Sequence, residues 1–396
     1  METDVSGPGQ RAERIGPYRI LQVLGEGGMG IVYEAEETDS VRRRVALKVV
    51  RDRHASKEVL ARFEVERQAL AVMNHPAIAK VFAAGTTPDG QPYFAMELVR
   101  GLPFTQYCDE HRLSVRERLE LFIAVCHGVQ HAHQKGVIHR DIKPSNILVT
   151  EADGVPEPRI IDFGIAKALG QQLTDLTLIT QFGHAVGTAA YMSPEQAESN
   201  GADIDTRSDV YSLGVLMYEM LVGELPSDPG TMGLHAYLAR LMARETDPPT
   251  PSDRIGSTSL DPTIVAKARS TDLPRLQRDL RGDLDWIVMK AMDPDRNRRY
   301  VTANALAVDL QRYLSNEPIT ARPPTAMYRL GKLVRRNRIA TIGAALGLVA
   351  ILAGAAFSTV GMVRARRAEH VAAQEAAAAR QVTDFLINIF NISNPN

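Results

Sequence analysis

The order of hydrophobic and polar positions divides the chain into a β-rich part, an α-rich part and a long apolar run. Alternating patterns in the first hundred residues predict three strands, at residues 18–24, 30–35 and 44–50. A helical pattern follows at residues 59–73. From Ser114 onward most patterns are helical, so we expect two lobes of the α+β class joined by a hinge.

Residues 339–363 form a run of 25 positions without a charged side chain. Roughly 20 apolar residues suffice for a helix to cross the hydrocarbon core of a bilayer. Basic residues flank this run: Arg329, Lys332, Arg335, Arg336 and Arg338 before it, and Arg364, Arg366 and Arg367 after it. These flanks favour a transmembrane helix over a buried core helix, and the larger cluster indicates a cytoplasmic N-terminal side. Residues 364–390 continue with helical spacing.

The overall composition is globular, with 44% hydrophobic and 23% charged residues, which excludes disorder over the whole length. The net charge of −1 combines two unlike parts. Residues 321–396 hold ten Lys or Arg and three Asp or Glu, a charge of +7, so the first 320 residues carry −8. The basic residues before the apolar run suit anionic lipid, and we expect no nucleic-acid partner. Two cysteines cannot form a disulfide framework and fit a reducing compartment.

The segment Gly25-Glu26-Gly27-Gly28-Met29-Gly30 fits the spacing G-x-G-x-x-G, which alone is a weak signal. In a dinucleotide-binding fold a helix follows these glycines, whereas here the alternating residues 31–35 predict a strand. The glycines would then form a hairpin tip whose backbone N–H groups can approach phosphates without side-chain obstruction. The alternative is a plain glycine-rich turn.

Lys48 ends the apolar stretch Val45-Ala46-Leu47-Lys48 on a predicted strand. A lysine in such a setting is costly unless a charged partner compensates it. The phosphates of ATP and a carboxylate of the following helix would supply two partners. Glu66 is our candidate for that carboxylate, and Glu64 is the nearby competitor.

The segment from His139 to Leu148 reads His-Arg-Asp-Ile-Lys-Pro-Ser-Asn-Ile-Leu, and Asp162-Phe163-Gly164 follows it. Phosphoryl transfer needs a carboxylate that orients the hydroxyl, oxygen ligands for Mg²⁺ and a positive charge near the moving group. Asp141 can orient the hydroxyl and Lys143 can supply the charge. Asn146 and Asp162 can bind Mg²⁺.

The ordered set of motifs resembles the eukaryotic-like (Hanks-type) Ser/Thr protein kinases of the bacterial transmembrane kind. The resemblance covers residues 18–314 and includes Ser193-Pro194-Glu195, where Ser193 replaces the more common Ala, and Asp209. It implies the bilobal protein kinase fold plus one transmembrane helix. The small β-rich N-lobe would span residues 18–98, and the larger helical C-lobe residues 101–314.

The remaining ranges complete the expected domain organisation. We expect a flexible N-terminus at residues 1–17, a basic juxtamembrane linker at 315–338, the transmembrane helix at 339–363 and a short helical tail at 364–396. Similar kinases often continue into a larger C-terminal region, so the resemblance suggests a truncated product.

The resemblance also implies a role for each matching residue. Lys48 would hold the phosphates and pair with Glu66, while Asp141 would be the catalytic base, with Lys143 beside it. Mg²⁺ would be bound by Asn146 and Asp162. The expected ATP-binding set is Leu24, Gly25, Glu26, Gly27, Gly28, Gly30, Val32, Ala46, Lys48, Met96 as gatekeeper, Glu97, Val99 and Leu148. Two structural roles follow as well: Glu195 would pair with Arg299, and Asp209 would brace the catalytic loop.

Regulation is the next implication of the resemblance. Arg140 would receive a phosphate from the activation segment, which spans residues 162–195. Thr174, Thr177 and Thr180 are the candidate acceptors, with Thr180 favoured, and the alternative is that they are ordinary loop threonines. Lys143 and Thr188 resemble the Ser/Thr-specific branch.

We therefore expect a single-pass protein of the cytoplasmic membrane, with its kinase domain in the cytoplasm. It would transfer the γ-phosphoryl group of ATP, with Mg²⁺, to Ser or Thr of protein substrates. One alternative is a nucleotide-binding membrane scaffold or sensor without phosphotransfer, and another is a small-molecule phosphotransferase. Gly343-Ala-Ala-Leu-Gly347 fits G-x-x-x-G and would allow a homodimer.

Two further features have no assigned activity. Residues 225–280 look like an insertion in the helical lobe, and loops of that length are usually functional or disordered. His127, His131 and His133 invite a metal site, but no fitting Cys or carboxylate completes it. We expect these histidines to be structural.

Overall fold

The computed structural model describes most of the 396-residue chain. The described residues are 14–27, 30–39, 42–50, 73–163, 189–198, 204–245, 247–257, 260–323 and 325–393. They belong to two compact units, Met1–Pro324 and Thr325–Asn396.

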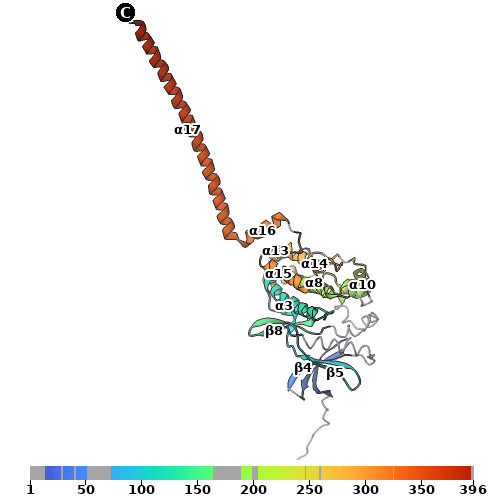
Figure 1. Ribbon diagram of the computed structural model, residues 1–396. Helices are drawn as coiled ribbons and strands as arrows, with labels where there is room; N and C mark the ends of the chain where they lie inside the picture. The colour runs from blue at the N-terminus through green and yellow to red at the C-terminus, as the bar shows by residue number, and fades with distance from the viewer. Residues whose placement is uncertain are drawn as a thin grey trace, which may run out of the picture. The chain divides into compact units, whose positions relative to one another are not determined.

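The first unit contains a β-rich lobe and a helical lobe (Figure 1). Its strands are β1 (Arg14–Ile15), β2 (Tyr18–Gly27), β3 (Gly30–Glu37), β4 (Arg43–Val50), β5 (Val81–Thr86), β6 (Pro92–Glu97), β7 (Leu102–Pro103), β8 (Ile147–Ala152) and β9 (Val155–Ile160). Its helices are α2 (Phe104–Glu110), α3 (Val115–Gln134), the 3-10 helix η1 (Pro144–Asn146), α7 (Pro194–Ala197), α8 (Thr206–Val222), α9 (Pro229–Met232), α10 (Leu234–Met242), α11 (Pro251–Arg254), α12 (Pro262–Ala268), α13 (Leu273–Leu280), α14 (Asp283–Ala291) and α15 (Ala303–Leu314).

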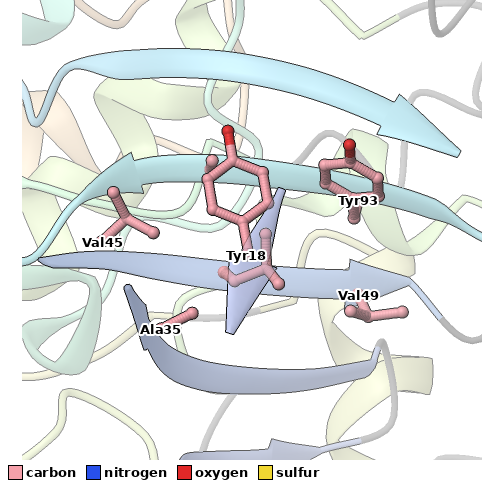
Figure 2. Packing of buried hydrophobic residues seen from close by; sticks show 7 residues of the cluster. Tyr18, Ala35, Val45, Val49 and Tyr93 are labelled. Atoms are coloured by element: carbon pink, nitrogen blue, oxygen red, sulfur yellow. The ribbon is translucent and has the colours of Figure 1, made fainter. Parts of the chain in front are cut away.

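The β-rich lobe is an antiparallel six-stranded sheet with the strand order β1-β2-β3-β4-β6-β5. The three predicted strands occur as β2, β3 and β4, each longer than predicted at one end. Apolar side chains on one face form a buried cluster that includes Tyr18, Val45 and Tyr93 (Figure 2). The rings of Tyr18 and Tyr93 meet edge to face, with centroids 5.8 Å apart.

The N-terminal range expected to be flexible differs in part from the structure. Arg14 and Ile15 form β1, which pairs with Arg19 and Tyr18 of β2. Ile15 also packs against the apolar cluster of the sheet. The end of this range is therefore an edge strand, anchored by the partial burial of the Ile15 side chain.

The helical lobe is built around α3, α8 and α15, which contact one another (Figure 1). Ser114 begins α3 with a capping box, since its hydroxyl accepts the backbone N–H of Glu117 and that carboxylate accepts the backbone N–H of Ser114. Helix α8 is buried along nearly its whole length, as its mostly apolar sequence predicts. Gly214 on α8 lets α14 approach, because a Cβ there would lie 2.9 Å from the Ala291 side chain.

Residues 225–280 are not a long loop, so that expectation is corrected. Their described part forms five short helices, α9 to α13, with buried apolar residues. Four of these helices start at an Asp or Thr cap with a proline in the first turn; the caps are Asp228, Thr250, Asp261 and Asp272. This signature of a helix start was present in the sequence, but the helices are too short to show apolar periodicity.

Arg269 fastens this helical segment to the rest of the lobe. Its guanidinium donates to the carbonyls of Leu221 at 2.7 Å and Met220 at 2.9 Å, at the end of α8. Arg118 of α3 donates to the same Met220 carbonyl at 3.1 Å. Burial, with Arg118 nearby, lowers the pKa of Arg269 to about 10. The segment is therefore tied to the core by charge-assisted bonds to helix C-terminal carbonyls.

The second unit consists of α16 (Ala326–Arg336) and α17 (Arg338–Ser393). The predicted span and the predicted tail helix thus belong to one continuous helix (Figure 1). Within the described residues, the stretch from Thr341 to Ile389 is long and apolar enough to cross a membrane. The range expected to be a basic linker contains α16, which begins at the cap Thr325.

Candidate active site

The glycine-rich segment forms the hairpin between β2 and β3. Gly27 pairs with Gly30 next to the turn, and Gly25 pairs with Val32. At Gly30, φ is +148° and an added Cβ would lie 2.0 Å from the Val49 carbonyl oxygen, so only glycine fits. Gly25, Glu26 and Gly27 lie on β2, whereas Gly28 falls outside the described residues.

Lys48 lies on β4, opposite Val32 of β3, and is only 7% exposed. Its ammonium forms an ion pair with the carboxylate of Asp162, which follows β9. Asp162 has a φ of +60°, so a sharp backbone turn presents its carboxylate to Lys48. Glu66, the expected partner of Lys48, lies outside the described residues.

Three of the residues expected around the adenine belong to the β-rich lobe and to the start of the hinge. Ala46 and Met96 are paired across β4 and β6, and each is 8% exposed. Glu97 follows at the end of β6, and its carboxylate accepts the backbone N–H of Lys80 at 3.1 Å.

Leu24 and Leu148, the two leucines of the expected nucleotide set, lie in different lobes. Leu24 lies on β2 and is 46% exposed, while Leu148 lies on β8 opposite Pro103. Val99 is half-buried in the connection after β6. The expected nucleotide set thus comes from the β-rich lobe, the hinge and the first strands of the helical lobe.

Asp141 is held by two neighbours from its own loop. The ammonium of Lys143 lies 3.0 Å from its Oδ2. The amide nitrogen of Asn146 donates to the same Oδ2 at 2.9 Å and to the Asp141 carbonyl at 2.8 Å. Both contacts fix the position of the carboxylate, as a group that orients a hydroxyl requires.

Asn146 and Asp162 supply the oxygen donors that suit a hard divalent cation. Because the Asn146 amide nitrogen bonds Asp141, the remaining amide oxygen is the group suited to coordination. Ile161 donates its backbone N–H to the Asn146 carbonyl at 2.9 Å, which links η1 to the segment that carries Asp162. No group of three His, Cys, Asp or Glu suited to a metal occurs within the described ranges, and Mg²⁺ needs only one or two carboxylates.

Asp209, near the start of α8, holds the backbone of the loop that carries Asp141. Its two oxygens accept the backbone N–H groups of His139 and Arg140, each at 2.8 Å. His133 of α3 lies 2.7 Å from Asp209 Oδ2 through Nε2. Burial alone would raise the pKa of Asp209, but these hydrogen bonds lower it, so the carboxylate stays charged.

The backbone turn at Arg140 is the strained element that this carboxylate supports. Arg140 has a φ of +63°, which is uncommon for a residue with a side chain. Its carbonyl accepts a hydrogen bond from Gln196 of α7 at 2.9 Å. Beside it, the His139 ring packs on buried Phe163 with centroids 4.7 Å apart, which joins the loop to the Asp162 segment.

Comparison with known proteins agrees with this arrangement. The model of the protein kinase domain matches residues 18–301. The chain belongs to the protein kinase family. It is 36% identical over 306 residues to the Ser/Thr-protein kinase PknB of Mycobacterium tuberculosis, covering 76% of this chain and 43% of that protein. It is 35% identical over 311 residues to the probable Ser/Thr-protein kinase SCO3848 of Streptomyces coelicolor, covering 77% of this chain and 41% of that protein.

A solved structure shows the same fold. The M. tuberculosis PknI kinase domain superposes with a TM-score of 0.53 at 23% identity, covering 78% of this chain and all of that domain. The fold is therefore the bilobal kinase fold, with a β-sheet N-lobe and a helical C-lobe. The matches span about two fifths of the length of the curated relatives.

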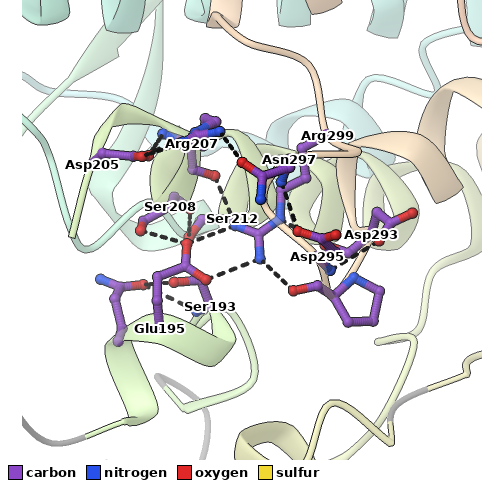
Figure 3. Close-up of polar contacts among 12 residues, drawn as sticks. Ser193, Glu195, Asp205, Arg207, Ser208, Ser212, Asp293, Asp295, Asn297 and Arg299 are labelled. Atoms are coloured by element: carbon purple, nitrogen blue, oxygen red, sulfur yellow. Dashed lines mark hydrogen bonds and ion pairs between the residues drawn. The ribbon is translucent and has the colours of Figure 1, made fainter. Parts of the chain in front are cut away.

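Glu195 and Arg299 form a buried ion pair in the kinase domain (Figure 3). The guanidinium of Arg299 donates to both carboxylate oxygens, at 2.7 and 3.0 Å, and to the Arg207 carbonyl at 3.0 Å. Ser208 donates its hydroxyl to Glu195 at 2.6 Å. Burial would raise the pKa of Glu195, but the bonds and charge of Arg299 lower it.

Three residues of the kinase site were missed by sequence reasoning about function. His133, Gln196 and Ser208 act through the backbone or through another side chain, so none carries a chemical signature of its own. His133 was singled out with its neighbours, yet its spacing on α3 does not point to Asp209. Only the fold brings residues 76 positions apart into contact.

Of the expected regulatory residues, only Arg140 lies within the part of the chain that the structure describes. Arg140 is described, and it borders a small depression beside Asp141 that Tyr191 and Met192 also line. The expected phosphate acceptors Thr174, Thr177 and Thr180, as well as Thr188, lie outside the described residues.

Proposed function

We propose that the protein is a Ser/Thr protein kinase that transfers the γ-phosphoryl group of ATP to protein hydroxyl groups. The observation that carries this proposal is the setting of Asp141. Its carboxylate contacts Lys143 at 3.0 Å and Asn146 at 2.9 Å, in a loop whose backbone is held by Asp209. The relatives named as Ser/Thr kinases support the same substrate class.

The contacts of the site residues support a separate part for each in the transfer. Asp141 accepts a hydrogen bond from the substrate hydroxyl and aligns it, and Lys143 offsets negative charge as the bond to phosphorus forms. Lys48 would hold phosphate oxygens, and the side-chain oxygens of Asn146 and Asp162 would hold Mg²⁺. When bound, ATP with Mg²⁺ would supply the phosphoryl group and neutralise its charge.

The wider setting is part of the proposal. We infer a single-pass anchor in the cytoplasmic membrane through residues 339–363, with the kinase domain in the cytoplasm where ATP is available. The basic flanks and the apolar stretch of α17 support this placement. Phosphate on the activation segment would pair with Arg140 and regulate the enzyme.

The nucleotide-binding scaffold remains the competing function, and one substitution separates the two. Asp141→Asn in the full chain should reduce transfer of radiolabelled phosphate to a basic test protein by about 10²–10⁴-fold, because the orienting carboxylate is lost. Asp153→Asn, at the exposed turn between β8 and β9, is the matched control and should leave transfer unchanged. Equal labelling by the Asp141→Asn variant and the unmodified chain would reject the proposed role of Asp141. Nucleotide binding by the unmodified chain without any labelling of the test protein would support the scaffold.

A further inference from the structure

Helix α16 has exposed apolar side chains along one face. The exposed face of a helix in a water-soluble protein usually carries polar side chains instead. Met327 is 79% exposed, Leu330 54%, Leu333 52% and Val334 40%. Their spacing of three, four and seven residues places them along one side of the helix. An exposed apolar stripe of this kind is a surface that fits an apolar partner.

The opposite side of α16 is basic. Arg329 and Arg336 are exposed and lie seven residues apart, so they share that side, whereas Lys332 between them is buried. The Lys332 ammonium lies over the ring of Tyr328, 5.9 Å from its centroid. No acidic residue occurs between Glu317 and Glu369 in the sequence. The helix therefore pairs an apolar face with a uniformly positive one.

The position of α16 in the chain selects the partner. It ends at Arg336, one residue before α17 begins at Arg338, and α17 carries the apolar span. A helix joined so closely to a membrane span cannot be far from the headgroup region. Helices with a basic face and an apolar face lie in that interface, and anionic lipid attracts their positive charges.

We propose that α16 is an interfacial helix that lies in the cytoplasmic surface of an anionic bilayer, with Met327, Leu330, Leu333 and Val334 in the acyl boundary. The exposed side chains of Arg329 and Arg336 then contact lipid phosphates. This inference rests on the proposed membrane anchor, and it adds a second, composition-sensitive contact with the lipid. The helix would hold the connection to the kinase domain flat against the membrane.

A depth measurement on the full chain in vesicles tests the proposal. A fluorescent label at Leu330→Cys reports the apolar face, and one at Tyr328→Cys, two residues away on the other side, is the matched control. Both native cysteines are buried, so the introduced site is the one that a surface reagent reaches. Quenching is measured with doxyl groups near the head of the acyl chain, in equimolar phosphatidylcholine and phosphatidylglycerol.

We expect stronger quenching of the Leu330 label than of the Tyr328 label. This difference should be lost in pure phosphatidylcholine, and it should also be lost in phosphatidylglycerol vesicles after Arg329→Gln and Arg336→Gln. Equal quenching of the two labels would overturn the proposal and indicate that a protein surface covers the apolar face. A difference that persists in pure phosphatidylcholine would overturn the role of anionic lipid.

A third label separates failure of this inference from failure of the anchor. Leu352→Cys lies within the apolar stretch of α17, and doxyl groups at the middle of the acyl chain should quench it. Quenching there with no difference between Leu330 and Tyr328 rejects only the interfacial helix. Absence of quenching at Leu352 rejects the anchor and with it the proposal for α16.

Discussion

Asp209 need not touch a substrate, yet two backbone N–H groups of the catalytic loop depend on its carboxylate. Both oxygens accept from the backbone, and His133 adds a third contact. The positive φ of Arg140 is maintained by these bonds. The two oxygen atoms of one buried carboxylate on α8 therefore support the strained backbone of the loop.

Replacing Asp209 with Asn tests that support. An amide offers one acceptor oxygen, so one backbone N–H of the loop would lose its partner, at a cost of about 1–3 kcal/mol in the free energy of unfolding. We expect kcat to fall while the KM for ATP changes little, because the loop and not the nucleotide site is disturbed. Chemical denaturation and steady-state kinetics measure the two effects, and unchanged kcat would contradict the positioning role.

The surroundings of His75 lead to a prediction of how the stability of the kinase domain depends on pH. Its ring lies 5.4 Å from that of His131, and its Nδ1 accepts the backbone N–H of Ala77. Burial lowers the pKa of His75, and the nearby His131 and His127 lower it further. The unfolded chain then binds the proton more tightly, so stability is complete above a pH of about 6.5 and falls below it.

His75→Gln should flatten this part of the pH profile. We expect the variant to lose less stability than the unmodified chain between about pH 7 and pH 5.5, since it removes one proton-binding group. His235→Gln, at an exposed position on α10, is the control and should leave the profile as it was. Urea unfolding at a series of pH values measures the slope. An unaltered slope in His75→Gln would show that the histidine contact does not set it.

Among the elements, α7 is held to the end of the kinase domain by the Glu195–Arg299 pair. Arg299 is fully buried and Glu195 nearly so. Glu195→Gln leaves the guanidinium without a counter-charge, and we expect it to lower the free energy of unfolding by about 3–5 kcal/mol. Glu198→Gln removes the half-exposed pair with Arg244 and should change it by less than about 1 kcal/mol. Similar losses in thermal unfolding of the two variants would contradict this reading.

The sequence predicted some elements well because their signals are local. Alternation gave β2, β3 and β4, and a charge-free run marked the apolar part of α17. The helices between residues 225 and 280 were missed, since four to nine residues are too few for apolar periodicity to stand out. Their Asp-Pro and Thr-Pro starts were the usable signal.

The site was predictable only where a motif has its own chemistry. The order of motifs placed Lys48 and Asp162, 114 residues later, in one site through the resemblance, but their ion pair was not predicted, because Glu66 was the expected partner of Lys48. Arg269 could not have been assigned, because its partners are backbone carbonyls that every residue type carries. Contacts to the backbone depend on the fold, and the sequence records them only indirectly.

In the whole molecule, the proposed membrane anchor makes a separate prediction. Leu348→Lys with Leu352→Lys places two charges in the apolar stretch of α17, each costing about 2.5–3.5 kcal/mol at the centre of a bilayer. The expressed protein should then leave the membrane fraction on alkaline carbonate extraction. Val371→Lys with Val382→Lys, beyond the expected span, should remain in that fraction. Extraction of both variants alike would contradict the assigned span.

The most direct test of the proposed activity is phosphoamino acid analysis of a protein substrate labelled by the full chain with radioactive ATP and Mg²⁺. We predict label on serine or threonine, none on tyrosine, and its loss in the Asp141→Asn variant. Bound nucleotide with no labelled amino acid, or label on tyrosine, would contradict a Ser/Thr protein kinase.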